Sequence, residues 1–255
     1  MPEQLKPPNI NSSFFDGYYK EIWRHMFPEK TTQAETDFII EECQLKPGDT
    51  VLDLMCGYGR HSLLLGSKEI HVTAVDNLPD YINEINKIAD KESLPVSGIC
   101  TDVVDMDLHE QFDAVICMGN SIQFFNNKEI LGLFRKIALH LKPGNKMIIN
   151  SCSLGEIAIK LFKEKTWARI DDMILITENK YLFQPTRIET TSIIIKDNGE
   201  REEKNAVDYI YSISEFEDML KQSGFRLEKI YSIPGKKIFS LGEPRAYIVS
   251  ERIKE

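Results

Sequence analysis

Residues 51–62 read VLDLMCGYGRHS, and this stretch decides the fold. Its apolar first half predicts a buried strand, Gly57 and Gly59 predict a turn, and its last residues begin a helix. A strand that runs through glycines into a helix creates a binding crevice at the carboxyl end of a sheet. The two glycines permit backbone angles and close approaches that a side chain would forbid. We therefore expect a ligand-binding crevice at this turn.

Strand and helix patterns alternate along the chain around this stretch. Thr32 and Glu35 have the spacing of a capping box and predict the start of a helix that precedes it. The alternation is typical of parallel βαβ units, so we expect an α/β fold with a doubly wound sheet. The expected strands span residues 50–55, 70–75, 96–100, 112–117 and 146–150, and the helices between them span residues 60–65, 79–90 and 128–141.

The pattern changes after residue 152. Ser153 with Glu156, and Ser214 with Glu217, predict two further capping boxes. Between them, residues 166–213 show period-two alternation with a hairpin signal at Asp197-Asn198-Gly199, which predicts an inserted antiparallel meander. Two closing strands are expected at residues 225–233 and 245–252. The expected divisions are an N-terminal arm and aromatic segment (1–30), the core (31–152), the insert (153–213) and the completion of the core sheet (214–255).

Composition and charge exclude several classes of protein. The net charge of −9, from 31 Lys and Arg against 40 Asp and Glu, argues against a nucleic-acid partner. No apolar run approaches the roughly 20 residues of a membrane span, and the first residues lack a secretory signal core, so we expect a cytoplasmic protein. The cysteines are scattered without CxxC spacing, which favours small buried thiols in a reducing compartment and no metal site. They are Cys43, Cys56, Cys100, Cys117 and Cys152.

Three residues near the turn narrow the choice of ligand. Asp76, at the end of the next strand, can take both hydroxyls of a ribose. Ser62 stands where a dinucleotide fingerprint has its third glycine, and Asp53 would repel a pyrophosphate but attract an ammonium group. A ligand with adenosine at one end and an amino acid at the other satisfies both facts. S-adenosylmethionine is such a ligand.

Five segments, in order over residues 48–150, resemble the class I S-adenosylmethionine-dependent methyltransferases. DLMCGYG (53–59) resembles the first motif, DxGCGxG, with Met55 where glycine is commonest. The resemblance implies a Rossmann-like, seven-stranded, mostly parallel sheet with an antiparallel edge, and an enzyme that transfers a methyl group from S-adenosylmethionine. The other matching segments are Asp76, Thr101-Asp102-Val103, FDAVICMGN (112–120) and LKPGNKMII (141–149).

The resemblance also implies roles around the cofactor. Gly57 and Gly59 would pass under the methionine part, Asp53 would lie near its ammonium group, and Asp76 would hold the ribose. Arg60 and His61 either fix the start of the following helix or are simply solvated there. The implied cofactor-binding residues are Asp53, Met55, Cys56, Gly57, Gly59, Asp76, Asn77, Leu78, Asp102, Val103, Met118, Gly119 and Asn120.

The acceptor is expected to be a small molecule. Residues 118–121 read MGNS, whereas NPPY or DPPY after the fourth strand would mark an amino-group methylase of DNA or of glutamine. In-line transfer from a sulfonium depends mainly on alignment and on exclusion of water, and it needs a general base only for a protonated acceptor. His25, Tyr19 and Asn120 are the catalytic candidates.

Two aromatic segments are candidates to cover the crevice. One is Phe14–Phe27 and the other is the meander, although their aromatic side chains could equally pack the insert against the main domain. The candidate lid and substrate residues are Tyr18, Tyr19, Trp23, Trp167, Arg169 and Tyr209.

Two alternatives stay open at this point. The first is an NAD(P)-dependent oxidoreductase on a related sheet, against which Ser62 and Asp53 argue. The second is a non-catalytic module that keeps the fold and the cofactor. A monomer and a homodimer through the edge strands of the insert are both compatible with the sequence.

Overall fold

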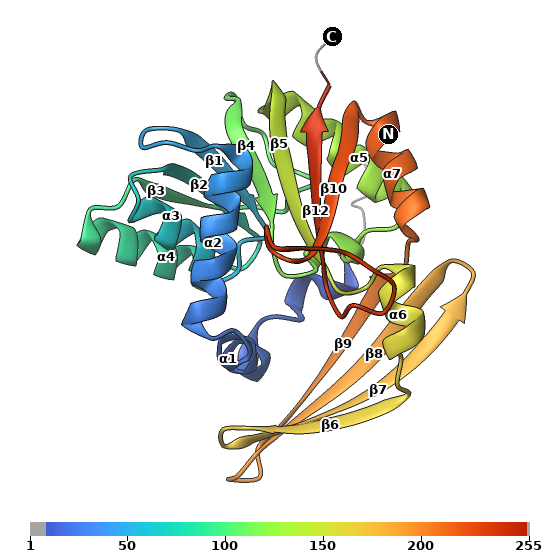
Figure 1. Cartoon of the computed structure of the whole chain (residues 1–255). Coiled ribbons are helices and arrows are strands. Elements are labelled where there is room, and N and C mark those ends of the chain that lie inside the picture. The colour runs from blue at the N-terminus through green and yellow to red at the C-terminus, as the bar shows by residue number, and fades with distance from the viewer. Residues whose placement is uncertain (1–8, 254–255) are drawn as a thin grey trace, which may run out of the picture. The chain divides into compact units, whose positions relative to one another are not determined.

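The computed structural model describes residues 9–253, which form two compact units (Figure 1). Within the described residues, the first unit comprises residues 9–26 and 163–208, and the second comprises residues 27–162 and 209–253. Residues 1–8 of the expected N-terminal arm lie outside this range.

The second unit is built on an eight-stranded sheet with strand order β11-β10-β12-β5-β4-β1-β2-β3. The five strands from β5 to β3 pair in parallel, whereas β12 pairs antiparallel with both β5 and β10. The expected α/β sheet with an antiparallel edge is confirmed, and the strand beyond the expected seven is the two-residue β11, too short to show a pattern in the sequence. The strands are β1 (Thr50–Leu54), β2 (His71–Asp76), β3 (Val96–Cys100), β4 (Phe112–Cys117), β5 (Leu141–Ser151), β10 (Phe225–Ile233), β11 (Lys237–Ile238) and β12 (Ala246–Arg252).

Helices cover both faces of this sheet because successive strand residues point to opposite faces. Leu52 and Leu54 pack in the cluster that contains α5 and α7, whereas Val51 packs in the cluster that contains α2 and α3. Ala74 of β2 packs against α4. The helices of this unit are α2 (Glu29–Cys43), α3 (Arg60–Gly66), α4 (Pro79–Glu92), the 3-10 turn η2 (Ser121–Phe124), α5 (Asn127–His140), α6 (Gly155–Leu161) and α7 (Ile213–Gln222).

The three expected capping boxes are wrong. Helix α2 begins three residues before Thr32, after Pro28, so Glu35 lies within the helix and is buried. Helix α6 has Leu154 at its N-cap without a side-chain bond, and the Glu156 carboxylate instead accepts the backbone N–H of Ile213, at 3.0 and 3.1 Å.

The capping boxes that form lie elsewhere. Ser212 with Glu215 begins α7, two residues before the expected pair, and Asn126 with Glu129 begins α5.

The first unit is a four-stranded antiparallel sheet with strand order β6-β7-β8-β9. The expected meander is confirmed, and the hairpin at residues 197–199 joins β8 to β9 with Gly199 at φ +88°. Ile22 of α1 packs against Met173 and Ile194 on this sheet. The elements are η1 (Ile10–Ser13), α1 (Gly17–Met26), β6 (Lys165–Ile170), β7 (Met173–Phe183), β8 (Thr186–Lys196) and β9 (Arg201–Tyr209).

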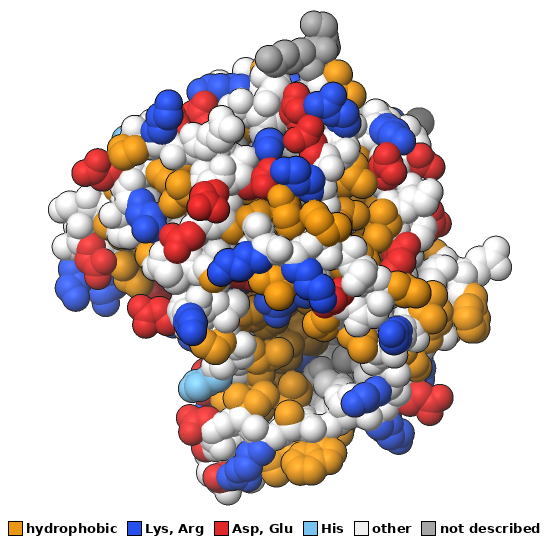
Figure 2. Space-filling model, viewed as in Figure 1, with side chains coloured by type: hydrophobic (Ala, Val, Ile, Leu, Met, Phe, Trp, Pro, Cys, Tyr) orange, Lys and Arg blue, Asp and Glu red, His pale blue; other side chains and the backbone are white. Residues whose placement is uncertain are grey.

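The surface and the thiols complete the description. Figure 2 shows acidic and basic side chains mixed over the face that it presents. Of the helices in residues 9–253, none has both the length and the apolar character that crossing a membrane requires. All five cysteines are free. Cys117 is buried and Cys43, Cys56 and Cys152 are partly buried, but Cys100 is exposed at the end of β3, so the expectation of a buried thiol is wrong for Cys100.

Candidate active site

The turn between β1 and α3 has a left-handed backbone at three positions. Met55, Gly57 and Gly59 adopt φ values of +52°, +57° and +76°. The Cys56 N–H donates to the Val75 carbonyl at 3.1 Å, and the Gly59 N–H donates to the Cys56 carbonyl at 3.1 Å. The conformation of Met55 gives a physical reason why glycine is commonest at this position of the motif, since left-handed backbone is costly for other residues.

The two glycines serve different purposes. A Cβ on Gly59 would lie 2.6 Å from Cγ1 of Ile85, so Gly59 allows α3 and α4 to approach closely. A Cβ on Gly57 would meet no atom within 4 Å, so it would stand in open space at the end of β1. Gly57 therefore lines a space that a side chain would fill, which is what a ligand lying over the turn requires.

Asp76 joins the turn to the end of β2. Its Oδ2 accepts the Gly57 N–H at 2.9 Å and its Oδ1 accepts the Leu78 N–H at 3.0 Å. Burial raises the pKa of this carboxyl, while the backbone N–H donors favour its ionised form. Each carboxylate oxygen can accept a further hydrogen bond. Asp76 can therefore both shape the turn and accept hydroxyl donors from a ribose.

Asp53 lies beneath the turn on β1 and is 1% exposed. Its Oδ2 accepts the hydroxyl of Ser62 at 2.6 Å. Burial raises the pKa of its carboxyl to about 7, although the Ser62 bond and the positive charge of Arg60 favour ionisation. Ser62 therefore has a definite task in place of the third glycine, since it ties the third residue of α3 to β1.

The parallel arrangement brings the other expected cofactor residues to the same edge of the sheet. Strands β1, β2 and β3 are neighbours, so the residues that follow them lie together at their carboxyl ends. Asn77 is exposed beyond β2. Beyond β3, Oδ1 of Asp102 accepts the Val104 N–H at 3.0 Å and Val103 is 3% exposed. This geometry is compatible with the expected roles, which stay predictions.

Beyond β4, Asn120 ties two loops together. Its Oδ1 accepts the Cys152 N–H at 2.6 Å and the Ser151 hydroxyl at 3.3 Å, and its Nδ2 donates to Oγ of Ser153 at 2.9 Å. Met118 is 7% exposed, and Gly119 and Asn120 have positive φ. The side chain of Asn120 is thus engaged in holding the end of β5 beside the loop after β4.

Gln123, which the sequence analysis did not single out, follows in η2. Its side chain is fully buried, and neither Nε2 nor Oε1 has a hydrogen-bond partner. A buried amide without partners costs about 1–3 kcal/mol. Its place, three residues beyond Asn120, puts this unpaired donor and acceptor in the loop that is expected to face the methyl acceptor.

The aromatic residues of α1 lie in the first unit. Tyr18 donates to Oε2 of Glu200 at 2.7 Å. Tyr19 packs on Phe14 with ring centroids 4.3 Å apart, and burial raises the pKa of its phenol, which keeps it protonated. Trp23 packs edge-on against Phe15, with ring centroids 5.1 Å apart.

His25 and the candidate lid residues on the strands of the first unit are more exposed to solvent. His25 is exposed, and its Nδ1 donates to the Glu21 carbonyl at 2.8 Å, so its Nε2 carries the lone pair when the ring is neutral. Trp167 is 74% exposed on β6, and Arg169 forms two 2.8 Å bonds with Asp197. Tyr209 belongs to the second unit and packs against its main cluster.

Arg60 and His61 are not simply solvated. His61 is 3% exposed, and both side chains bind Oε2 of Glu35, at 2.6 Å for Arg60 and 3.0 Å for His61. The sequence analysis assigned Glu35 to a capping box with Thr32, and so did not predict that Glu35 binds Arg60 and His61.

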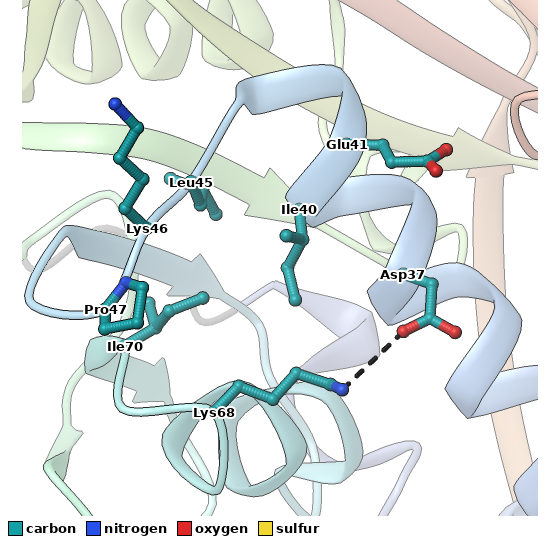
Figure 3. A pocket seen from close by; sticks show the side chains of 8 residues that line it. All are labelled: Asp37, Ile40, Glu41, Leu45, Lys46, Pro47, Lys68 and Ile70. Carbon is teal, nitrogen blue, oxygen red and sulfur yellow. Dashed lines mark ion pairs between the residues drawn. The ribbon is translucent and has the colours of Figure 1, made fainter.

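A surface pocket lies elsewhere on the second unit. It is lined by residues that precede β1 and β2, such as Pro47 and Ile70, together with the ion pair of Lys68 and Asp37 at 3.8 Å (Figure 3). These residues stand at the amino ends of the parallel strands, whereas ligands of open α/β sheets bind at the carboxyl ends. The pocket is therefore separate from the candidate active site.

Comparison with known proteins agrees with this geometry. Residues 51–144, which contain the turn and the ends of β2, β3 and β4, match the family model described as "Methyltransferase domain". This part of the chain therefore resembles a methyltransferase domain. S-adenosylmethionine is the expected cofactor, and the open space at Gly57 and the placing of Asp76 fit it. Nothing in the comparisons supports the NAD(P)-dependent alternative.

Individual relatives match different parts of the chain. YqeM of Bacillus subtilis (strain 168), whose name places it among methyltransferases, is 26% identical over 200 residues, which are 74% of this chain and 78% of that protein. The glycine/sarcosine N-methyltransferase of Parasynechococcus marenigrum (strain WH8102) is 33% identical over 47% of this chain and 44% of that protein. An S-adenosylmethionine-dependent methyltransferase from Clostridium acetobutylicum ATCC 824 has the same fold, with a TM-score of 0.80, 20% identity, and coverage of 93% of this chain and 97% of that one.

The two glycines of the turn between β1 and α3 should respond differently to substitution. Gly57→Ala places a methyl group in open space, so we expect the Kd for S-adenosylmethionine to rise about tenfold or more, with a strain of only about 1–2 kcal/mol. Gly59→Ala adds a clash with Ile85 and should lower the Tm further. Thermal denaturation and calorimetric titration measure both effects. Unchanged binding by Gly57→Ala would contradict the role given to this glycine.

Gln123→Met should stabilise the protein when no ligand is added. The near-isosteric apolar side chain removes the cost of an unpaired buried amide, so the Tm should rise by about 2 °C or more. Gln222→Met, at an exposed position of α7, is the matched control and should leave the Tm nearly unchanged. A lower Tm for Gln123→Met would show that the buried amide is satisfied in solution.

Proposed function

We propose that this chain transfers the methyl group of S-adenosylmethionine to a small-molecule acceptor. The observation that carries the proposal is the turn after β1, where open space at Gly57 adjoins the two-oxygen contact of Asp76 with Gly57 and Leu78. S-adenosylmethionine, when bound, supplies an electrophilic methyl group on a sulfonium. The small-molecule acceptor named for the P. marenigrum relative supports the same class of acceptor here.

In this proposal the chain accelerates the reaction by holding the cofactor and the acceptor in place more than by acid–base chemistry. Asp76 would orient the ribose, Asp102 and Val103 would hold the adenine, and Asp53 would favour the positive methionine end through its charge. Met118, Gly119 and Asn120 would line the side of the crevice from which the acceptor approaches. Alignment of this kind can supply much of the acceleration of a displacement reaction.

We place the choice of acceptor in the first unit. Its sheet and α1 carry the expected lid and substrate residues other than Tyr209, and among them Trp167 has a largely exposed ring and Arg169 an exposed guanidinium. Such groups can contact a ligand without first breaking a hydrophobic core. For an acceptor that arrives protonated, His25 is the proposed base, since its ring is exposed with Nδ1 bonded to the Glu21 carbonyl, whereas Tyr19 stays protonated.

The proposal extends to location and partners. The unpaired state of all five cysteines supports a reducing, cytoplasmic environment. The acidic net charge supports a small molecule rather than a nucleic acid as partner. A monomer and a homodimer are both compatible with the proposed chemistry.

Asp76 variants test the cofactor site. Wild-type protein should bind S-adenosylmethionine in a saturable way, and Asp76→Ala should raise the Kd by about a hundredfold because it loses the ribose contact and two loop bonds. Asp76→Asn keeps one oxygen acceptor and should lie between the two. Calorimetric titration measures each Kd. Absence of binding by the wild-type chain would end the proposal, and failure to methylate any small acceptor would favour a non-catalytic module.

Asp53 should link cofactor binding to pH. A bound cation favours the ionised carboxylate, so binding should lower the pKa of Asp53 from about 7 and release a proton. The affinity should therefore increase as the pH rises toward about 7 and then level off. Calorimetry in two buffers of different ionisation enthalpy detects the released proton, and Asp53→Asn should abolish the difference. If the apparent binding enthalpies of the wild-type protein are equal in the two buffers, binding releases no proton, and Asp53 does not respond to the charge of the ligand.

A further inference from the structure

A buried carboxylate joins three separate segments of the second unit. Glu35 of α2 is fully buried. Its Oε2 accepts from Nη1 of Arg60 at 2.6 Å and from Nε2 of His61 at 3.0 Å. Its Oε1 accepts from the hydroxyl of Tyr247 at 2.6 Å and from Nη1 of Arg245 at 3.4 Å. We call these five residues the Glu35 cluster.

The contacts of the cluster favour the ionised form of its carboxylate. Hydrogen bonds from His61 and Tyr247 and the positive charge of Arg60 lower the pKa of Glu35 to about 2, against the effect of burial. Burial lowers the pKa of His61, so a neutral imidazole donates Nε2–H to the carboxylate. The guanidinium carbons of Arg60 and Arg245 lie 4.5 and 5.6 Å from the ring centre of Phe27. Loss of the negative charge would leave two neighbouring cations uncompensated.

The cluster meets the cofactor turn at its helical end. Arg60 and His61 are the first two residues of α3 and follow Gly59 directly. Gly59, at the N-cap, offers no side-chain cap, so the helix start depends on tertiary contacts. The third residue, Ser62, is tied to Asp53. The first turn of α3 is thus held by side chains of its first three residues.

The cluster also reaches the acceptor side of the site. Tyr247 is paired with Asn150 of β5, and the neighbouring Ala246 is paired with Ser151. Ser151 and Cys152 in turn donate to the side chain of Asn120. A continuous path of bonds therefore runs from α3 through Glu35 and β12 to the loop after β4.

We propose that Glu35 is a positioning residue, which fixes the first turn of α3 and with it the Gly57–Gly59 backbone over which the cofactor lies. The inference rests on the proposed function, since it names a residue that acts through the cofactor turn without touching the ligand. It differs from a purely structural role, in which loss of Glu35 would lower stability and leave the affinity of the folded protein unchanged.

A second ion pair, which is partly exposed, provides a control with similar connections. Asp113 on β4 accepts from Nζ of Lys142 at 2.7 Å and from the N–H and hydroxyl of Thr50, at 3.0 and 2.9 Å. It thus joins three segments through one carboxylate, as Glu35 does. Thr50 begins β1, so this pair lies at the amino end of the parallel strands, away from the turn.

The experiment compares Glu35→Gln with Asp113→Asn in the full chain. Titration calorimetry with S-adenosylhomocysteine, at a temperature where thermal denaturation shows each variant folded, gives the Kd. We expect Glu35→Gln to raise the Kd about tenfold or more and Asp113→Asn to change it less than about threefold. Amide hydrogen exchange should be faster at residues 57–62 in Glu35→Gln alone. Glu35→Asp, which keeps the charge, should recover part of the affinity.

The outcomes separate the two proposals. If the wild-type chain binds and Glu35→Gln binds equally well once folded, the positioning role is wrong while the proposed function stands. The positioning role is also wrong if the Kd rises in both variants in proportion to their loss of Tm. Should Glu35→Gln fail to fold, Glu35→Asp is compared with Tyr247→Phe, which removes a bond on the β12 side only. The positioning role then requires the larger Kd for Glu35→Asp.

Discussion

A backbone that turns left-handed at Met55, Gly57 and Gly59 is the constraint on which the rest of the site depends. It lets β1 end and α3 begin within a few residues, so the N-terminus of the helix lies at the carboxyl edge of the sheet. Only glycine at position 59 allows the contact with Ile85, and through it the packing of α4. The open space at Gly57 follows from the same turn. Fold and binding surface therefore have one cause here.

Two buried carboxylates beside this turn show how the number of hydrogen-bond donors affects the pKa of a carboxyl group. Asp53 receives one hydroxyl, and burial raises the pKa of its carboxyl to about 7. Glu35, equally removed from water, receives four donors, and the pKa of its carboxyl falls to about 2. The first carboxyl has its pKa near neutral pH, whereas the donors around the second favour its ionised form. Burial alone would have given both the same direction of shift.

The sequence predicts those features that depend on neighbouring residues. The turn, the parallel strands β3 and β4, the closing strand β10 and the hairpin at Asp197–Gly199 follow from local pattern, and the structure has them at the expected positions. The spacing of a capping box is also local, yet it misplaced three helix starts, and in two of them the glutamate, Glu35 or Glu156, instead binds groups distant in sequence. Tyr247 lies 212 positions from Glu35, and no local pattern predicts such a partner. The roles of Asp102, Met118 and the aromatic residues of α1 stay predictions for a related reason, since they depend on a ligand.

The division of the first unit between two distant stretches of chain has a consequence for biosynthesis. Helix α1 finds its apolar partners, Met173 and Ile194, only on strands that the ribosome makes long after it. The apolar face of α1 around Ile22 therefore lacks these packing partners while the parallel strands β1 to β5 are synthesised. Nascent chains that expose such apolar segments are prone to aggregate, and chaperones bind them.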